Sequence, residues 1–310
     1  MSYQLRKSES LGDNLCRISC KQLDAAIAIA RGEVQPKDGD TPVHEMRKHL
    51  KKARAALRLV PKEIARGLYR EQDCALRDVG RLTSEIRDAE VRLQTVRQLE
   101  GIAQHNGRNG YKKLEEMLTL ELENFVVAFA EWQAQGVPIL EQARSAIDHW
   151  ALDQFGCRQL CTAVQASYKQ ARSALTTAAA NPTAENFHAF RTQAKRLGYQ
   201  LRILRPINPL VLKALSDDLR SLGDLLGRAH DLNFLGARLR TENGRSKWQR
   251  EGQKLLGVIE LGQTDLQRSA EELAEHFFAE RPRDFSARLG SWLKEWESKS
   301  SPSLAEALVT

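Results

Sequence analysis

Basic side chains recur on one face of a predicted helix in the first fifth of the chain. Residues 44–61 read HEMRKHLKKARAALRLVP. At 100° per residue, His44 and Lys51 share a face, whereas Leu50 and Leu57 lie on the opposite face. Lysine and arginine side chains bind phosphate and carboxylate oxygens, so the chemistry that this spacing predicts is anion binding. The cationic face comprises His44, Arg47, Lys48, Lys51, Lys52, Arg54 and Arg58.

The cationic face lacks acidic partners of its own. Like charges four residues apart destabilise a helix by about 0.2–0.5 kcal/mol per pair, and Arg47 with Lys51 is one such pair. Glu45 is the only acid between Val43 and Lys62. A solvated helix would normally mix glutamate into this spacing, so we expect an external anion to neutralise the face. For one isolated helix, the alternative is an ordinary solvated face.

The same pattern returns in the second half of the chain. When His188 is aligned with His44, Arg191 meets Arg47 and Lys195 meets Lys51, with no gap. Thr192 replaces the base at the Lys48 position and Gly198 replaces Arg54, so we expect the second copy to be less basic and the ligand to lie asymmetrically. The cations of this copy are His188, Arg191, Lys195, Arg196 and Arg202.

Two further matches support an internal repeat. Residues 76–89, LRDVGRLTSEIRDA, match 219–232, LRSLGDLLGRAHDL, and His230 stands where Arg87 does. Cys-Arg-x-x-Cys occurs at Cys16 and again at Cys157. Three matches in the same order predict two similar halves that meet near residues 150–156. Weaker ligand candidates from the second match are Arg77, Arg81, Arg220 and Arg228.

The elements that must position these residues are helices. The chain has 310 residues, of which 42% are hydrophobic and 6% aromatic, and strand-like alternation is hard to find. Ala, Leu, Glu, Lys, Arg and Gln dominate long stretches between Gly, Pro and Asn breakers. We therefore predict an all-α fold. The predicted helices are 14–31, 41–60, 63–103, 110–135, 138–152, 157–180, 183–205, 211–241, 246–280 and 283–299.

Composition excludes several classes of protein. No apolar run reaches the length of about 18 residues that a membrane-spanning helix needs. The N-terminal stretch also lacks the apolar core of a secretory signal. A net charge of +7 makes the chain only mildly basic. Five cysteines are too few for a disulfide framework, and an odd number cannot all pair within the chain. We expect a cytoplasmic protein without a membrane partner.

Several residues have a structural alternative to a functional role. His44 and His188 begin their helices after a proline and a Thr or Asn cap, where backbone N–H groups also favour a phosphate. Either histidine could instead be a hydrogen-bonded spacer between helices. Asp88 and Asp231 could hold a metal, but partners for neighbouring arginines are the better interpretation. The paired cysteines are expected to be core residues rather than zinc ligands.

The motif His44-x-x-Arg47-x-x-x-Lys51-Lys52, its second copy and the later match resemble the CHAD family, the histidine-containing all-α domain. The resemblance covers residues 12–300. It implies two antiparallel four-helix bundles of long helices, related by a pseudo-twofold axis, with a central basic cleft or pore. We expect a single domain built of repeats at about 12–152 and 155–300, flanked by flexible tails at 1–11 and 301–310.

The resemblance also implies binding of inorganic polyphosphate by the cations named above and targeting to polyphosphate granules. The Glu-x-Glu-x-Lys signature of the triphosphate-hydrolysing domain that often accompanies this family does not occur, so we expect a stand-alone member. No Walker loop, His-Glu-x-x-His or Gly-x-Ser-x-Gly motif is present, so neither an enzyme nor a cofactor is expected. A nucleic-acid backbone binder and, less favoured, a metal-dependent polyphosphate phosphohydrolase are the alternatives. The sequence does not indicate an oligomeric state.

Overall fold

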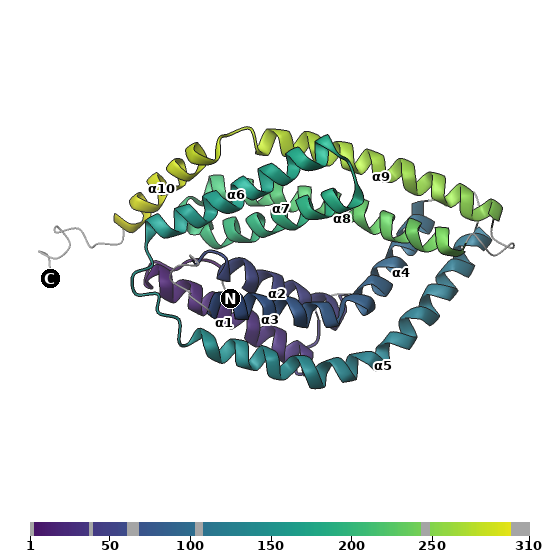
Figure 1. Ribbon diagram of the computed structural model, residues 1–310, viewed down its shortest axis with the longest axis horizontal. Helices are drawn as coiled ribbons and strands as arrows, with labels where there is room; N and C mark the ends of the chain where they lie inside the picture. Colours follow the sequence, from purple (N-terminus) through teal and green to yellow (C-terminus); the bar gives the residue numbers. More distant parts are fainter. Residues whose placement is uncertain (1–2, 37–39, 61–67, 103–107, 243–248, 299–310) are drawn as a thin grey trace, which may run out of the picture.

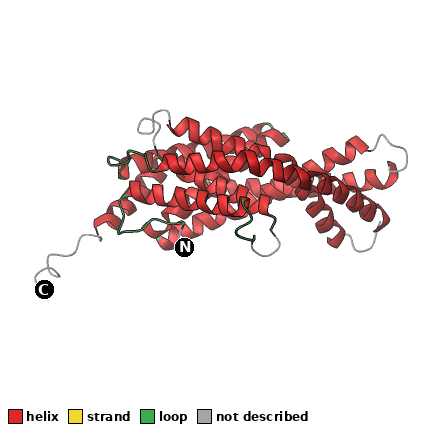
Figure 2. Ribbon diagram, turned by 90° about the horizontal axis from the view of Figure 1, so that it is seen from below, coloured by secondary structure: helices red, strands yellow, loops and turns green. Residues whose placement is uncertain are grey.

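The computed structural model describes the part of the chain given by residues 3–36, 40–60, 68–102, 108–242 and 249–298. Over these residues the chain forms helices joined by turns and loops, with no strand (Figures 1 and 2). The predicted all-α fold is confirmed. The elements are α1 (Leu11–Ala30), α2 (Pro42–Leu57), α3 (Leu68–Leu82), α4 (Ser84–Ile102), α5 (Arg108–Ile147), α6 (Cys157–Ala180), α7 (Ala184–Leu204), a 3-10 turn η1 (Arg205–Ile207), α8 (Pro209–Glu242), α9 (Gln249–Phe277) and α10 (Pro282–Ser298).

The helices of the two halves pack in a similar order. Helices of one half pack against helices of the other in two places. In the first half α2 packs on α1, and α1 and α3 both pack on α5. In the second half α7 packs between α6 and α8, and α10 packs on α6. The halves meet where α2 packs on α7 and again where α4 packs on α8 (Figure 1). Because α2 and α7 carry the two copies of the basic motif, the first of these contacts brings the copies together.

The apolar core extends across both contacts between the halves. The largest apolar cluster combines α6, α7 and α10 with Leu15 of α1 and with Leu59, which follows α2. A second cluster lies inside the first half, around Met46 and Trp132. A third joins α4 and α5 to α8 and α9 and includes Val96 and Leu235. Two of the three clusters therefore contain residues from both halves.

The predicted helix 63–103 is wrong as one element, because it breaks at Thr83 into α3 and α4. Thr83 donates a hydrogen bond from its hydroxyl to the Gly80 carbonyl at 3.1 Å, and its own carbonyl accepts from the Arg87 N–H. Side-chain hydrogen bonds of this kind compete with the helical pattern. In the second half Leu226 stands at the equivalent position, and α8 runs on without a break.

The predicted break between 110–135 and 138–152 does not exist, because α5 runs through Pro138. Proline removes one backbone hydrogen bond and bends a helix without necessarily ending it. A bend is visible along α5, which wraps around the first half (Figure 1). Gly136 lies against the Trp132 ring, where a Cβ would sit 2.9 Å from ring carbons, so the bulk of Trp132 is accommodated here by a glycine.

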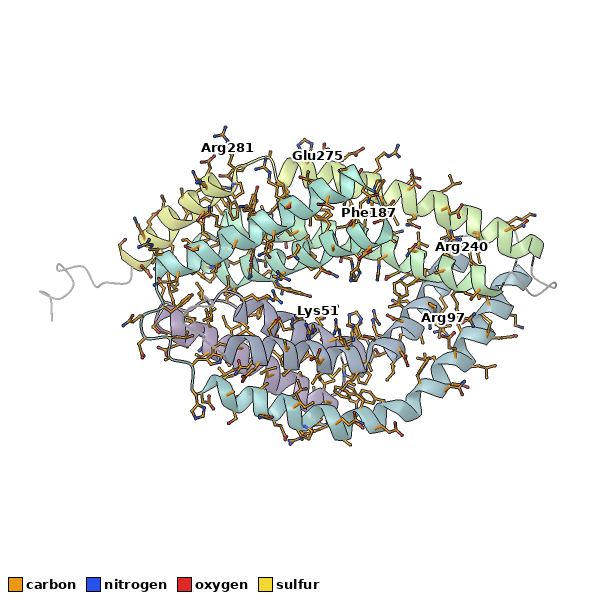
Figure 3. The ribbon with its side chains drawn as sticks, viewed as in Figure 1. Lys51, Arg97, Phe187, Arg240, Glu275 and Arg281 are labelled. Carbon is orange, nitrogen blue, oxygen red and sulfur yellow. The ribbon has the colours of Figure 1, made fainter. Side chains whose placement is uncertain are left out.

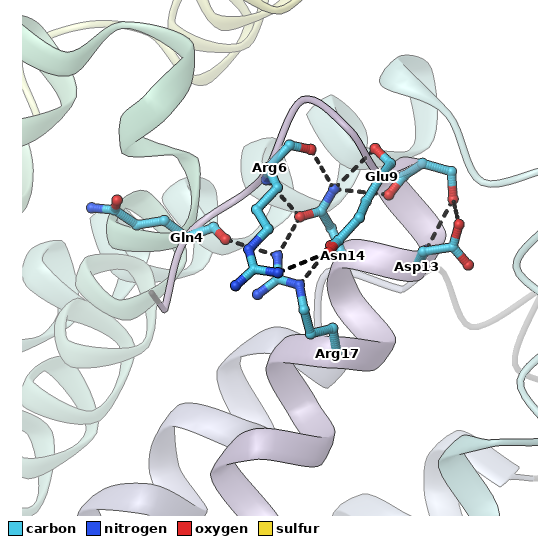
Figure 4. Close-up of polar contacts among 7 residues, drawn as sticks. Gln4, Arg6, Glu9, Asp13, Asn14 and Arg17 are labelled. Carbon is cyan, nitrogen blue, oxygen red and sulfur yellow. Dashed lines mark hydrogen bonds and ion pairs between the residues drawn. The ribbon is translucent and has the colours of Figure 1, made fainter. Parts of the chain in front are cut away.

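The prediction of a flexible tail over residues 1–11 is also wrong for the described residues 3–10. Leu5 is buried, and its N–H donates to the Ile203 carbonyl of α7 at 3.0 Å. Asn14 of α1 closes the segment, accepting from the Arg6 N–H at 2.7 Å and donating to the Arg6 carbonyl at 2.9 Å (Figure 4). A buried leucine with paired backbone groups explains the order. The predicted tail 301–310 lies outside the described residues.

None of the helices in the described part of the chain combines the length and the apolar character that a bilayer crossing requires.

Candidate functional site

The position of Lys51 follows from how α2 begins and which face it buries. Pro42 occupies the first turn, and the Thr41 hydroxyl accepts from the His44 N–H at 3.1 Å. Met46 and Leu50 are buried against the first-half core, at 0% and 3% exposure. The opposite face must then turn away from that core, and Figure 3 shows Lys51 on the side of α2 that faces α7 and α8.

Four cations from three helices surround the Lys51 ammonium. Burial lowers the pKa of Lys51 well below its usual value, and the charges of Lys195, Arg191, Arg47 and Arg87 lower it further. Interactions of this kind weaken with distance and screening, so these side chains lie close together. We call Arg47, Lys51, Arg87, Arg191 and Lys195 the cationic cluster. It draws on α2, α4 and α7, and therefore on both halves of the chain.

The Lys51 side chain is accessible to solvent. It is exposed by surface area, yet the surrounding protein disfavours its charged form. Lys195 is half-buried, and its pKa is lowered to about 8, first by burial and then by the charge of Arg191.

Three members of the cationic cluster make no direct polar contact in the described part of the chain, although the charges of Asp224 and Asp231 act on Arg191 and Lys195 from a distance. Within the described residues, Lys51, Arg191 and Lys195 form neither an ion pair nor a hydrogen bond. The Arg191 Nε–H is buried without an acceptor. A buried donor left unpaired costs about 1–3 kcal/mol. Protein folding alone does not satisfy these groups, whereas an anion bound between α2 and α7 would.

Two glycines of α8 let the second-half cations lie against its backbone. A Cβ at Gly227 would sit 3.3 Å from Arg191 Nη2, and a Cβ at Gly223 would sit 3.1 Å from Lys195 Cγ. A Cβ at either position would require these side chains to shift by about a few tenths of an ångström. Our sequence interpretation missed this role, although Gly223 stood in the repeat opposite Gly80.

Arg47 is held more firmly than its counterpart Arg191. Its guanidinium donates to the Gly80 carbonyl, to the Thr83 hydroxyl at 3.1 Å and to the Ser84 hydroxyl at 3.5 Å. A guanidinium on the last carbonyls of α3 is favourable, because the C-terminal end of a helix carries partial negative charge. Arg47 thus contacts the break between α3 and α4, the helix that carries Arg87.

The histidines next to the cationic cluster are uncharged near neutral pH. The His188 and His230 rings lie with centroids 4.6 Å apart. Burial and then the charge of Arg191 lower the pKa of His230 to about 3. Burial and then the charge of Arg87 lower the pKa of His44 to about 4. Neutral imidazoles can still donate one hydrogen bond to an anion.

Asp88 and Asp231 lie near the arginines of the cationic cluster. Burial raises the pKa of each carboxyl, and the charge of Arg47 opposes this rise at Asp88, as that of Arg191 does at Asp231. Within the described residues neither carboxyl forms an ion pair, so their interpretation as partners of arginines stays a prediction. Across the described residues, no three His, Cys, Asp or Glu side chains are grouped to hold a metal ion.

Arg54 and Arg58 do not join the cationic cluster. Both bind Asp73 of α3, with Arg54 Nε 2.9 Å from Oδ1 and Arg58 Nη2 2.6 Å from Oδ2. The expectation that the cationic face lacks acidic partners is therefore wrong for these two residues. Their partner comes from another helix, which inspection of α2 alone could not show. Lys48 also has a partner, Glu45 Oε1 at 2.6 Å.

The remaining predicted residues lie around or outside the cationic cluster. Lys52 and Arg202 flank the Tyr3 ring at 5.8 and 5.9 Å. Arg196 donates to Gln170 of α6 at 3.1 Å. The weaker candidates are on the surface: Arg77 and Arg81 beside Asp78, Arg220 beside Asp217, and Arg228 exposed on α8. Arg87 and His230 were not chosen from the sequence, although their alignment with each other was the available signal.

The cysteines form no disulfide among the described residues. Burial raises the pKa of Cys16 and of Cys20 to about 11, as expected for thiols packed in apolar surroundings. Cys157 donates to Glu297 Oε2 at 2.7 Å. None of these thiols contacts the cationic cluster.

Comparisons with known proteins agree on one fold. A family model described as the CHAD domain matches residues 20–240. The crystal structure of the CHAD domain from the plant Ricinus communis is similar, with a TM-score of 0.59 and 18% sequence identity. This match covers 89% of this chain and 94% of the plant domain. No curated protein sequence matches the chain.

Proposed function

The chain belongs to the CHAD domain family, and from this premise we propose that it binds inorganic polyphosphate at the cationic cluster between α2 and α7 without catalysing a reaction. The family is linked to polyphosphate binding in general. The observation that carries the proposal is the unpaired state of Lys51, Arg191 and Lys195.

A chain of phosphates suits these residues because it carries repeated charge with no other recognisable features. Lys51 comes from the first half and Arg191 and Lys195 from the second, so one linear ligand can contact both copies of the motif. Arginine can donate two parallel N–H groups to one phosphate, and lysine provides a point charge. The neutral imidazoles of His44 and His188 add donors without further charge repulsion.

Nucleic acid is the alternative ligand. Proteins that bind single strands place aromatic platforms between basic residues, so that bases stack on them. Tyr199 is half-buried beside the cluster, and Phe234 packs against His230 at 4.7 Å. This offers little stacking surface, so polyphosphate is the better proposal. Binding to the backbone of a double strand is the form of this alternative that the test must address.

The acids near the cationic cluster interact with arginines, and this favours a non-enzymatic role. Phosphoryl transfer normally needs carboxylates that hold Mg²⁺ beside the basic residues. Asp88 and Asp231 lie on α4 and α8, and each carboxyl interacts with an arginine. The polyphosphate phosphohydrolase predicted as the less favoured alternative would release phosphate from polyphosphate when Mg²⁺ is added. We extend the proposal to association with polyphosphate granules in the cytoplasm, where such a ligand would be concentrated.

A competition titration tests the proposal. Labelled long-chain polyphosphate is bound at about 0.15 M salt, the physiological ionic strength. Unlabelled polyphosphate, single-stranded DNA, double-stranded DNA or RNA is then added, matched in total phosphate. Displacement by polyphosphate alone is expected. Equal displacement by nucleic acids would make the cluster a general polyanion surface and overturn the specific proposal.

A further inference from the structure

Lys51 has the surroundings of a reactive amine. Its side chain is exposed and, within the described residues, has no ion pair or hydrogen bond. By contrast, Lys48 on the same helix is paired with Glu45 at 2.6 Å, and Lys213 on α8 is paired with Asp217 at 3.5 Å. An amine reacts through its lone pair, which exists only in the uncharged form. Lysines without a carboxylate partner are the ones most able to reach that form.

The neighbours of Lys51 act on the amine and on an incoming reagent together. Lys195, Arg191, Arg47 and Arg87 all disfavour a positive charge on Lys51. The same cations attract negative charge, and the Arg191 Nε–H is buried without an acceptor. A reagent that carries a phosphate group would therefore be held beside an exposed amine that, within the described residues, forms no ion pair. Figure 3 shows Lys51 on the side of α2 that faces α7 and α8.

We propose that Lys51 is an acylation site for small acyl phosphates, with Arg191 and Lys195 holding the phosphate while the Lys51 amine attacks the acyl carbon. The Lys51 Nζ lone pair forms a C–N bond, and the C–O bond to the phosphate breaks. The phosphate leaves with that electron pair, and the ammonium formed on Nζ loses its proton to the departing phosphate or to water. The products are an amide at Lys51 and inorganic phosphate, with no oxidant, reductant or metal required.

Acylation would change the cationic cluster itself. The amide is neutral, so one charge is removed from the place where the two halves meet. Resting on the function proposed above, this makes acylation of Lys51 a way to weaken polyphosphate binding, and bound polyphosphate a way to protect Lys51. The acylation reaction does not depend on polyphosphate being the ligand.

The test compares two reagents on the intact chain. Acetyl phosphate carries the anionic group, whereas the N-hydroxysuccinimide ester of acetate is a neutral acetyl donor. Site occupancy at Lys51 is measured by peptide mass spectrometry over time, with the exposed Lys213 as the internal reference. We expect Lys51 to react several-fold faster than Lys213 with acetyl phosphate, because Lys213 is paired with Asp217 whereas Lys51, within the described residues, forms no ion pair and has cations beside it that attract the phosphate. The preference should be larger for acetyl phosphate than for the neutral ester.

Two variants identify the source of the preference. Arg191→Gln should reduce the excess preference for acetyl phosphate, whereas Arg281→Gln, on the outer surface in Figure 3, should leave it unchanged. Equal rates at Lys51 and Lys213 with acetyl phosphate, or an equal preference with both reagents, would overturn the proposal. A separate titration with long-chain polyphosphate reports the proposed function. Failure of polyphosphate to bind, with the Lys51 preference intact, would contradict that function alone.

Discussion

At the scale of single residues, the cations of α2 differ in whether a carboxylate is paired with them. Their residue type does not predict this difference. Lys51 and Arg54 lie three residues apart on related faces, yet Lys51 is unpaired and Arg54 is bound to Asp73 at 2.9 Å. A paired arginine already has its charge satisfied and gains little from a ligand. An unpaired lysine among cations gains the most, because a bound anion relieves repulsion from all of its neighbours.

Reversing the charge of the two unpaired lysines should weaken polyphosphate binding. We expect Lys51→Glu with Lys195→Glu to lower affinity by at least about tenfold, since a hydrogen bond to a charged group contributes about 1.5–3 kcal/mol and about 1.4 kcal/mol is a factor of ten. The slope of log affinity against log salt should flatten by about one to two, as expected for the loss of two phosphate contacts.

The matched control is Lys213→Glu with Lys294→Glu, which changes net charge equally on exposed positions outside the cluster. It should leave the slope nearly unchanged. Equal losses in both double variants, with helical content intact, would show that net charge rather than the cluster binds the ligand.

The depressed histidine pKa values predict how stability depends on pH. In the unfolded chain histidine titrates near 6.5, whereas in the folded chain the pKa of His230 is about 3 and that of His49 about 4. The unfolded state therefore binds more protons between these values, and the unfolding free energy should fall as pH drops from 7 to 4. Urea unfolding at fixed ionic strength measures this.

His230→Asn removes one of these groups and should make the decline between pH 7 and 4 shallower. An unfolding free energy of the native chain that stays constant from pH 7 to 5 would contradict the half-buried, neutral state of these rings.

At the scale of elements, α8 provides a smooth surface on which the cations of α7 lie. Gly223 and Gly227 are spaced four apart, so both face α7 from successive turns. Glycine inside a helix costs about 0.5–1 kcal/mol relative to alanine, and this cost is offset only if the space is needed. Here the space is filled by Lys195 and Arg191.

Replacing Gly227 should therefore separate stability from binding. We expect Gly227→Ala to raise or maintain the melting temperature through helix propensity, while displacing Arg191 and weakening polyphosphate binding a few-fold. Gly257 of α9 is the matched control, since a Cβ there meets nothing within 4 Å. Gly257→Ala should raise the melting temperature and leave affinity unchanged. Unaltered affinity in Gly227→Ala would mean that the position of Arg191 does not matter for the ligand.

At the scale of the whole molecule, the site exists only because the halves are joined. The N-terminal segment connects the two halves. The Leu5 N–H donates to the Ile203 carbonyl of α7, and the Tyr3 hydroxyl donates to the Lys52 carbonyl of α2 at 3.0 Å. Gln200 of α7 also donates to the Ala55 carbonyl of α2 at 3.3 Å. These contacts set the separation of α2 and α7 and thus the width of the space between the two cationic faces.

Truncating the buried side chain of this segment should destabilise the whole domain. We expect Leu5→Ala to lower the unfolding free energy by about 2–5 kcal/mol, as for other buried leucines. Leu210→Ala, at 85% exposure on α8, should change it by no more than about 0.5 kcal/mol. Urea unfolding measures both. Similar small losses in the two variants would show that the N-terminal segment is not part of the cooperative unit.

The sequence by itself determined the helical class, the repeat and the location of the basic motif. Helical periodicity is local, and a cationic face opposite a buried apolar face can be counted along α2 without a structure. Helix ends were less certain: a proline at 138 bends α5 without ending it, and Thr83 ends α3 although threonine is no strong breaker. The break at Thr83 is contacted from another helix, since Arg47 of α2 donates to the Gly80 carbonyl and to the Thr83 hydroxyl.

Only the tertiary structure decided which cations belong to the site. Asp73 neutralises Arg54 and Arg58 from a different helix, and Arg87 and His230 reach the cluster because α4 and α8 pass beside it. Pairing and burial are set by residues distant in sequence, and a helical wheel contains no information about them. The unpaired state of Lys51, Arg191 and Lys195, on which the proposed function rests, is a property of how the two halves pack.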